Sequence, residues 1–169
     1  VEGAALRVYH HIRGMGLKEL LMEQQTSVII DAGHGGAEPG AMFEGRKEKD
    51  DTLRLAVAVG EILENNGIRV MYTRTTDVYD TPLEKAMIAN GSGADFFVSI
   101  HRNAMPVPGT GKGALNLVYE NTGPGALMAE NIQKNLVKAG FDDLGVQKAF
   151  VATGKVVHST STEYGKPFG

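Results

Sequence analysis

Short apolar runs alternate along this chain with longer segments in which apolar residues recur at helical spacing. Runs rich in β-branched and aromatic residues predict four strands, at residues 28–30, 68–73, 95–100 and 114–119. Helical spacing predicts three helices that alternate with them, at about residues 50–66, 81–89 and 125–139. We therefore expect an α/β fold with a mainly parallel, helix-covered sheet, because strands joined through helices run parallel.

The segments that flank the first predicted helix are polar or rich in glycine. Asp50 or Asp51 is expected to cap the start of this helix with its carboxylate. Residues 37–46, which precede it, are interpreted as a Gly-rich loop. Residues 1–25 stand apart from the alternation and predict an N-terminal extension or linker helix, followed by one domain over residues 26–169.

Two of the predicted strands end on a histidine. The first strand breaks into Gly33-His34-Gly35, where the glycines leave room beside the imidazole, and the third ends at Ile100-His101. Glu48 lies where the chain enters the first helix. In open α/β sheets, sites form outside the carboxyl ends of the strands. We therefore expect His34, Glu48 and His101 to meet at one edge although they are far apart in sequence.

This set of side chains predicts a catalytic zinc site that holds one ion. Two imidazoles and one carboxylate give zinc three protein ligands and leave a position for water. Bound zinc lowers the pKa of that water from about 15.7 to about 7 and polarises a carbonyl oxygen, which favours hydrolysis. The chain has no cysteine, which excludes Cys-ligated zinc, thiol catalysis and disulfide bonds.

The length, composition and net charge of the chain limit the classes of protein and partner to be considered. The 169 residues, 42% hydrophobic and 22% charged, have the composition of one ordinary globular domain. A net charge of -3 gives no reason to expect nucleic acid or an anionic membrane as the partner. No stretch approaches the ~20 apolar residues of a membrane span, and no signal peptide is recognisable. The Lys-Ser/Thr of a P-loop and the spacing of a serine hydrolase nucleophile elbow are also missing from the sequence.

Several short motifs occur in a fixed order over about residues 27–153. They are Asp31-Ala32-Gly33-His34-Gly35-Gly36, Glu48-Lys49-Asp50, Thr73-Arg74, Ala89-Asn90 and Ser99-Ile100-His101-Arg102-Asn103-Ala104. Together they resemble the zinc-dependent N-acetylmuramoyl-L-alanine amidases of the type-3 family, which occur as bacterial autolysins, cell-division and sporulation amidases, and phage endolysins. The resemblance implies a single twisted sheet with helices on both faces, and cleavage of the amide between N-acetylmuramic acid and L-alanine. By this resemblance His34, Glu48 and His101 match the zinc ligands of the family.

The resemblance weakens toward the C-terminus. Glu163, followed by Tyr164-Gly165, falls at about the expected distance after His101 for the catalytic Glu-x-Gly motif, and it is the expected proton shuttle. Residues 158–162 before it are polar where the family has an apolar strand, and the closing helix of the family is missing. The C-terminal end is therefore interpreted as atypical or truncated. Three further positions depart from the residues usual in the family: Lys85, Arg102 and Leu144.

Peptidoglycan is the expected substrate, and Asn103 is expected to offer it polar contacts in an open groove near the metal. The expected location is extracytoplasmic, in the cell wall or periplasm, or at a wall reached by a phage enzyme. Two alternatives stay open from the sequence. One is a zinc peptidase acting on another amide of the peptide stem, and the other is a catalytically impaired amidase-like domain that binds peptidoglycan or a partner protein. The sequence leaves the oligomeric state undetermined.

Overall fold

The computed structural model describes residues 25–102 and 113–149, together with the backbone of four two-residue strands nearer the C-terminus. The predicted N-terminal extension thus lies almost wholly outside the described residues. The chain divides into two compact units, Val1–Ile100 and His101–Gly169, and each is described by itself. The four short strands pair as two antiparallel hairpins. They are β8 (Val151–Ala152), β9 (Lys155–Val156), β10 (Thr162–Glu163) and β11 (Lys166–Pro167).

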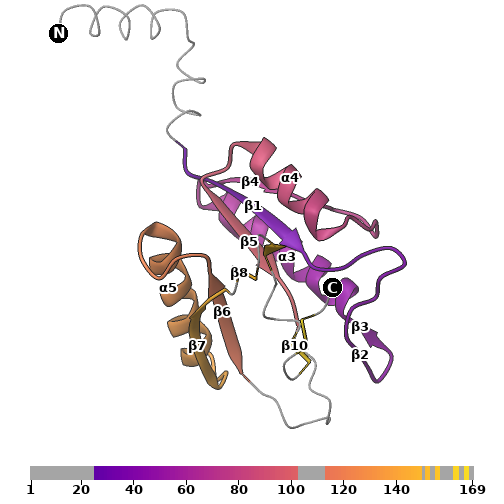
Figure 1. Cartoon of the computed structure of the whole chain (residues 1–169). Helices are drawn as coiled ribbons and strands as arrows, with labels where there is room; N and C mark the ends of the chain where they lie inside the picture. Colours follow the sequence, from indigo (N-terminus) through magenta and orange to yellow (C-terminus); the bar gives the residue numbers. More distant parts are fainter. Residues whose placement is uncertain are drawn as a thin grey trace, which may run out of the picture. The chain divides into compact units, whose positions relative to one another are not determined.

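The first unit is built on a three-stranded parallel sheet with the order β4-β1-β5 (Figure 1). Its strands are β1 (Ser27–Ala32), β4 (Arg69–Tyr72) and β5 (Phe96–Ile100). Helix α3 (Glu48–Asn65) connects β1 to β4, and α4 (Pro82–Ser92) connects β4 to β5. The chain therefore leaves β1 toward one neighbouring strand and returns to the other, so that the strand order reverses between β1 and β5.

The two helices cover opposite faces of the sheet. Val28, Ile30 and Ala32 of β1 point to one face and form a buried cluster with Ala56 of α3. Helix α4 covers the other face, where its Lys85 contacts Asp31 and the carbonyl of Ala32 in β1. Every residue of β1 is buried, as is typical of a central parallel strand with helices on both sides. This arrangement confirms the predicted helices on both faces.

Helix α3 begins earlier than the sequence predicted. It starts at Glu48, its N-cap is Lys47, and no side chain caps it, so the expected cap at Asp50 or Asp51 is wrong. The backbone N–H groups of Glu48 and Lys49 instead donate to carbonyls in the preceding loop. These bonds satisfy donors that a capping side chain would otherwise serve.

The loop before α3 also contains a small hairpin that the sequence did not predict. Residues 37–46 were expected to be irregular, but β2 (Met42–Phe43) pairs antiparallel with β3 (Arg46–Lys47). Glu44 and Gly45 at the turn both have positive φ. The hairpin places β3 directly before the first turn of α3.

The second unit contains a parallel β-α-β arrangement. Strand β6 (Ala114–Val118) is followed by α5 (Pro124–Lys138) and by β7 (Asp143–Lys148), which pairs with β6. Buried Gln133 of α5 donates to the carbonyl of Ala114 at 2.7 Å and to the Asp143 carboxylate at 2.6 Å. One helix side chain therefore joins both strands.

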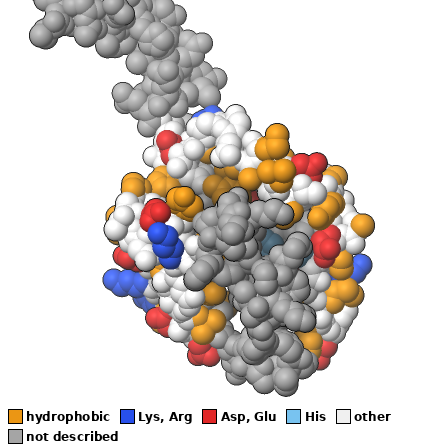
Figure 2. Space-filling view, in the orientation of Figure 1, with side chains coloured by type: hydrophobic (Ala, Val, Ile, Leu, Met, Phe, Trp, Pro, Cys, Tyr) orange, Lys and Arg blue, Asp and Glu red, His pale blue; other side chains and the backbone are white. Residues whose placement is uncertain are grey.

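The α/β class with mainly parallel strands is confirmed. The parallel strands that the structure describes pair in the orders β4-β1-β5 and β6-β7, and the other described strands form antiparallel hairpins. None of the described helices is both long and apolar enough to cross a bilayer. Acidic and basic side chains are interspersed over the described surface in the view of Figure 2, in keeping with the small net charge of the chain.

Candidate metal centre

The carboxyl ends of β1 and β5 carry the two histidines singled out from the sequence. His34 follows β1 after a single glycine, and His101 is the residue directly after β5. The backbone N–H of Gly33 donates to the carbonyl of Ile100 at 3.0 Å, so the two strand ends are hydrogen-bonded just before both histidines. This is the point at which the strand order reverses, where open α/β sheets form their binding sites.

His34, Glu48 and His101 converge at this edge. One ligand atom from each lies within 4.8 Å of the others, and Nε2 of His34 lies 3.2 Å from Oε2 of Glu48. Nδ1 of His34 faces the Glu38 carboxylate at 3.8 Å. The structure therefore brings together all three residues that the sequence nominated as metal ligands.

Glu48 is almost completely buried, with 2% of its surface exposed, and the loop before α3 contacts it closely. Its Oε2 accepts the backbone N–H of Ala41 at 2.9 Å, and its own N–H donates to the carbonyl of Ala41. Gly40, with φ of 65°, lies against both His34 and Glu48, because a Cβ there would fall 2.5 Å from the His34 ring and 2.8 Å from the Cβ of Glu48. Only glycine fits this position, so the loop packs closely around both side chains.

The chemistry and spacing of these donors fit a zinc ion. Zinc is bound at about 2.0–2.2 Å by imidazole nitrogen and carboxylate oxygen, which separates tetrahedral ligand atoms by roughly 3.4 Å. The 3.2 Å between His34 and Glu48 is close to this value. A buried carboxylate facing imidazole rings is also costly unless a cation or hydrogen bonds compensate it. The site therefore has the composition of a three-ligand metal centre.

A buried polar cluster lies beneath the site, around Asp31 of β1. Its carboxylate accepts hydrogen bonds from Thr73 and Ser99 at 2.6 Å each and forms an ion pair with Lys85 at 2.8 Å. Burial is the largest influence and raises the pKa of Asp31, but the bonds from Lys85, Ser99 and Thr73 together lower this pKa below its ordinary value. Asp31 is therefore a buried anion that joins all three strands of the sheet to α4.

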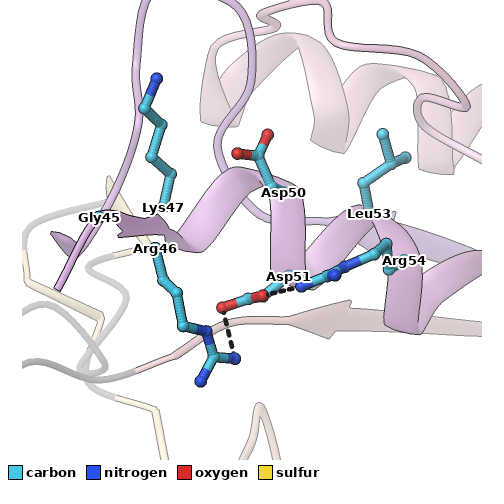
Figure 3. A pocket seen from close by; sticks show the side chains of 7 residues that line it. All are labelled: Gly45, Arg46, Lys47, Asp50, Asp51, Leu53 and Arg54. Atoms are coloured by element: carbon cyan, nitrogen blue, oxygen red, sulfur yellow. Dashed lines mark hydrogen bonds and ion pairs between the residues drawn. The ribbon is translucent and has the colours of Figure 1, made fainter. Parts of the chain in front are cut away.

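An open groove of about 420 Å³ lies between β3 and the first turns of α3. It is lined by residues on both sides of Glu48 in the sequence: Gly45, Arg46, Lys47, Asp50, Asp51, Leu53 and Arg54. Figure 3 shows Arg46 and Arg54 both reaching the carboxylate of Asp51. Two guanidinium groups share one carboxylate there, so this side of the groove carries excess positive charge.

Two residues named from the sequence are not tested by the structure. Glu163 lies in β10, whose partner is β11, and its side chain is outside the described part of the chain. Asn103 also lies outside the described residues. The assignment of Glu163 as the proton shuttle and of Asn103 as a substrate contact therefore stays a prediction.

Sequence reasoning missed the residues that hydrogen-bond to the segments carrying His34 and Glu48. Arg74, at the carboxyl end of β4, is 3% exposed and donates hydrogen bonds to backbone carbonyls next to His34 and Glu48. Asp77 accepts hydrogen bonds from the same region. The position of Arg74 directly after the predicted strand at residues 68–73, at the same edge of the sheet as both histidines, was the available signal.

Comparison with known families and proteins identifies relatives of this chain. A family model described as N-acetylmuramoyl-L-alanine amidase matches residues 28–164. The chain is 37% identical over 128 residues to the sporulation-specific N-acetylmuramoyl-L-alanine amidase of Bacillus subtilis, covering 73% of this chain and 49% of that protein. It is 36% identical over 130 residues to the endolysin of Bacillus phage SPP1, covering 72% and 47%. The chain thus spans about half the length of the curated relatives it matches.

Solved structures resemble this fold as well. The N-acetylmuramoyl-L-alanine amidase AmiC2 of Nostoc punctiforme aligns with a TM-score of 0.68 and 31% identity, covering 73% of this chain and 69% of that chain. Cwp6 from Clostridium difficile aligns with a TM-score of 0.74 and 32% identity, covering 82% of this chain and 22% of that chain.

Proposed function

Because this chain belongs to the N-acetylmuramoyl-L-alanine amidase family, we propose that it is a zinc-dependent hydrolase of bacterial peptidoglycan. The bond cleaved is the amide between N-acetylmuramic acid and the L-alanine of the peptide stem. Water adds across this C–N bond, which leaves a carboxylic acid on the sugar side and a free amino group on the alanine. The relatedness to an amidase and to an endolysin supports this proposal.

The observation that carries the proposal is the convergence of His34, Glu48 and His101. Their ligand atoms lie within 4.8 Å of one another at the edge where β1 and β5 end. Three protein ligands that include two imidazoles are typical of catalytic zinc sites, because a structural site usually has four. One zinc ion held by these residues is therefore the proposed cofactor.

The residues of the chain are proposed to divide the work of hydrolysis. When bound, zinc lowers the pKa of a nearby water molecule and polarises the carbonyl to be attacked. Glu163 is proposed to take a proton from the attacking water and deliver it to the departing amine. Asn103 is proposed to orient the substrate with polar contacts. Asp31, already ionised and paired with Lys85, is a structural anion rather than the base.

The substrate is an extended glycopeptide, and the surface beside Glu48 suits such a ligand. The groove between β3 and α3 is open and lined mainly by charged side chains. Peptidoglycan stems carry carboxylates and the glycan is polar, so an open groove lined by charged side chains fits them better than a closed apolar pocket. Because this polymer lies outside the cytoplasm, we propose that the protein acts in the cell wall or periplasm, either as a host enzyme or as one delivered by a phage.

Muropeptide analysis tests this proposal. Purified peptidoglycan is digested with the protein, with and without a chelator, and new amino termini are identified by labelling and mass spectrometry. We expect free L-alanine amino termini that appear only without chelator and return when zinc is restored. The His34→Ala variant serves as the matched control for contaminating hydrolases.

Other outcomes would redirect the assignment. New amino termini on a later stem residue would identify a zinc peptidase instead, since the ligands alone do not select the scissile bond. Stoichiometric zinc with no new termini on several peptidoglycan types would identify a binding domain without turnover. The polar residues 158–162 ahead of Glu163 are the sequence feature that motivates this last alternative.

A further inference from the structure

The loop that carries His34 has an unfavourable backbone conformation. Three consecutive residues have positive φ, with values of 60° at His34, 146° at Gly35 and 53° at Gly36. Glycine adopts such angles readily, but a histidine in the left-handed region is disfavoured by its Cβ. Conformations of this kind persist where the surrounding structure over-determines them. Contacts from outside the loop must therefore hold His34 in place.

The guanidinium of Arg74 donates hydrogen bonds to the two residues that precede His34. Its Nε donates to the carbonyl of Ala32 at 3.0 Å, and its Nη2 donates to the carbonyl of Gly33 at 3.0 Å. These two carbonyls belong to the last residue of β1 and to the residue directly before His34. The planar guanidinium holds both carbonyls in a fixed geometry that the flexible ammonium of a lysine does not reproduce.

The same guanidinium also donates a hydrogen bond to the segment that carries Glu48. Nη2 of Arg74 donates to the carbonyl of Lys49 at 2.9 Å, one residue beyond Glu48 in the first turn of α3. The hydroxyl of Thr52 lies within the same cluster and donates to the carbonyl of Gly33 at 2.8 Å. A single buried side chain therefore connects the two backbone segments that present the first two metal ligands.

Asp77 contacts the chain after His34 and the first turn of α3. Its Oδ1 accepts the backbone N–H of Gly36 at 2.7 Å, and its Oδ2 accepts a hydrogen bond from Lys49 at 2.6 Å. Nζ of Lys49 also donates to the carbonyl of Gly36 at 2.8 Å. Between these contacts, Gly35 lies directly against the carbonyl of Val78, because a Cβ on Gly35 would fall 1.9 Å from that oxygen.

We propose that residues 74–78, here called the brace, position His34 and Glu48 for metal binding while supplying no ligand atom. The brace touches the chain before His34, the two glycines after it, and the residue after Glu48. It opposes relaxation of the left-handed His34 backbone and fixes the spacing of the two segments. Arg74 and Asp77 are thus positioning residues, and this role rests on the proposed metal-dependent function.

Asp77 gives the sharper test because its side chain is 51% exposed, so its removal does not open a cavity in the core. The variants are Asp77→Ala and Arg74→Lys. The matched control is Asp95→Ala, because Asp95 also accepts a backbone N–H and a side-chain donor at 2.7 Å each, both from Ser27 at the other end of β1. Asp95 therefore loses the same kinds of contact far from the ligands.

The first measurement is zinc affinity by competition with a chromophoric chelator, together with the visible spectrum of the cobalt-substituted protein. We expect Asp77→Ala and Arg74→Lys to bind zinc at least about tenfold more weakly and to alter the cobalt spectrum, since outer-shell changes typically cost 10–100-fold in affinity. Asp95→Ala should keep wild-type affinity. Wild-type affinity in both brace variants, or equal weakening in the control, would overturn the proposal.

The second measurement uses the metal-free protein, so that it does not depend on the proposed function. Hydrogen exchange is followed at the Gly35 amide, which donates to the carbonyl of Glu38 at 3.0 Å. We expect this amide to lose protection in Asp77→Ala and to keep it in Asp95→Ala. Unchanged protection would refute the brace. If the wild-type protein binds no zinc while the amide responds as expected, the proposed function fails and the brace is a structural device.

Discussion

His34 combines two features, a left-handed backbone and a side chain that faces the buried carboxylate of Glu48. The first costs free energy and the second requires compensation for the Glu48 charge. A cation bound between the side chains would offset the second cost directly. The residue-scale design of the centre therefore favours metal binding over an empty cluster of polar groups.

Replacing both histidines tests the ligand assignment most directly. His34→Ala/His101→Ala leaves at most one of the three proposed protein ligands, so we expect loss of stoichiometric zinc and of all chelator-sensitive activity. The measurement is elemental analysis after dialysis against metal-free buffer. Circular dichroism serves as the control for folding. One equivalent of zinc retained by the folded double variant would contradict the site.

Glu163 is the proposed base, and replacing it with glutamine tests that role separately from metal binding. Glu163→Gln keeps the size of the side chain but cannot accept a proton, so we expect normal zinc content and a turnover reduced by roughly 10²–10⁴-fold. Turnover on purified peptidoglycan and zinc content are measured on the same preparation. Activity equal to that of the wild-type protein would show that another group moves the proton.

The convergence of His34, Glu48 and His101 could be predicted from the sequence, whereas the residues that support them could not. Each histidine follows an apolar run that is legible by itself, and Glu48 lies at a recognisable entry to a helix. Arg74 and Asp77 act through backbone atoms of Gly33, Gly36 and other residues. Their role depends on β1 and β4 being neighbours, and residue type alone carries no record of that pairing.

At the scale of elements, Lys85 attaches α4 to β1. It lies at 2.8 Å from both the Asp31 carboxylate and the carbonyl of Ala32, and neither Lys85 nor Asp31 is more than slightly exposed. The Lys85→Met variant should lose about 3–5 kcal/mol of unfolding free energy, because it leaves a buried carboxylate without its cation. Urea denaturation at neutral pH measures the loss.

The pH dependence of this variant has a definite sign. In the wild-type protein the pKa of Asp31 is lowered, so its contribution to stability is present above the ordinary value of 3.8 and is lost as the pH falls through the lower folded-state value. Without Lys85, the pKa of Asp31 should be higher than in the wild-type protein, because burial still raises it and the hydrogen bond and charge of Lys85 no longer lower it. The deficit of Lys85→Met should therefore be largest at pH 7 and shrink toward pH 4.

A surface ion pair provides the control for Lys85→Met. Lys148 and Glu120 lie 2.7 Å apart, close to the 2.8 Å of Lys85 and Asp31, but both of their side chains are at least half exposed. Lys148→Met should cost less than about 1 kcal/mol at any of these pH values, since exposed pairs contribute little. Equal losses in the two variants, or a Lys85→Met deficit that grows toward pH 4, would contradict the account of Asp31.

Elements with a strong local signal could be predicted, and those made by their neighbours could not. Helix α4 has a capping box at Thr81 and Glu84 and ends at Gly93, so local chemistry defines it. Strand β7 contains one β-branched residue, Val146, and a left-handed Gly145, and it becomes a strand through pairing with β6. The β2-β3 hairpin could not be predicted for the same reason, because its two-residue strands are defined by their pairing with each other.

At the scale of the whole molecule, the proposed metal centre unites positions far apart in the chain. His34, Glu48 and His101 meet only when the β1-α3-β4-α4-β5 segment has folded, because each ligand is delivered by a different element of it. An unfolded chain offers no such preformed site. Zinc should therefore bind the folded state in strong preference to the unfolded state and stabilise it by mass action.

This linkage predicts a zinc-dependent melting temperature. Free zinc at 100 times its dissociation constant stabilises the folded state by about 2.7 kcal/mol. For a domain of this size each kcal/mol raises the melting temperature by about 2–4 °C, so we expect a shift of roughly 5–10 °C. Differential scanning calorimetry with buffered zinc measures it, and His34→Ala/His101→Ala should show no shift. A wild-type melting temperature independent of zinc, or an equal shift in the double variant, would mean that this edge of the sheet is not the metal centre.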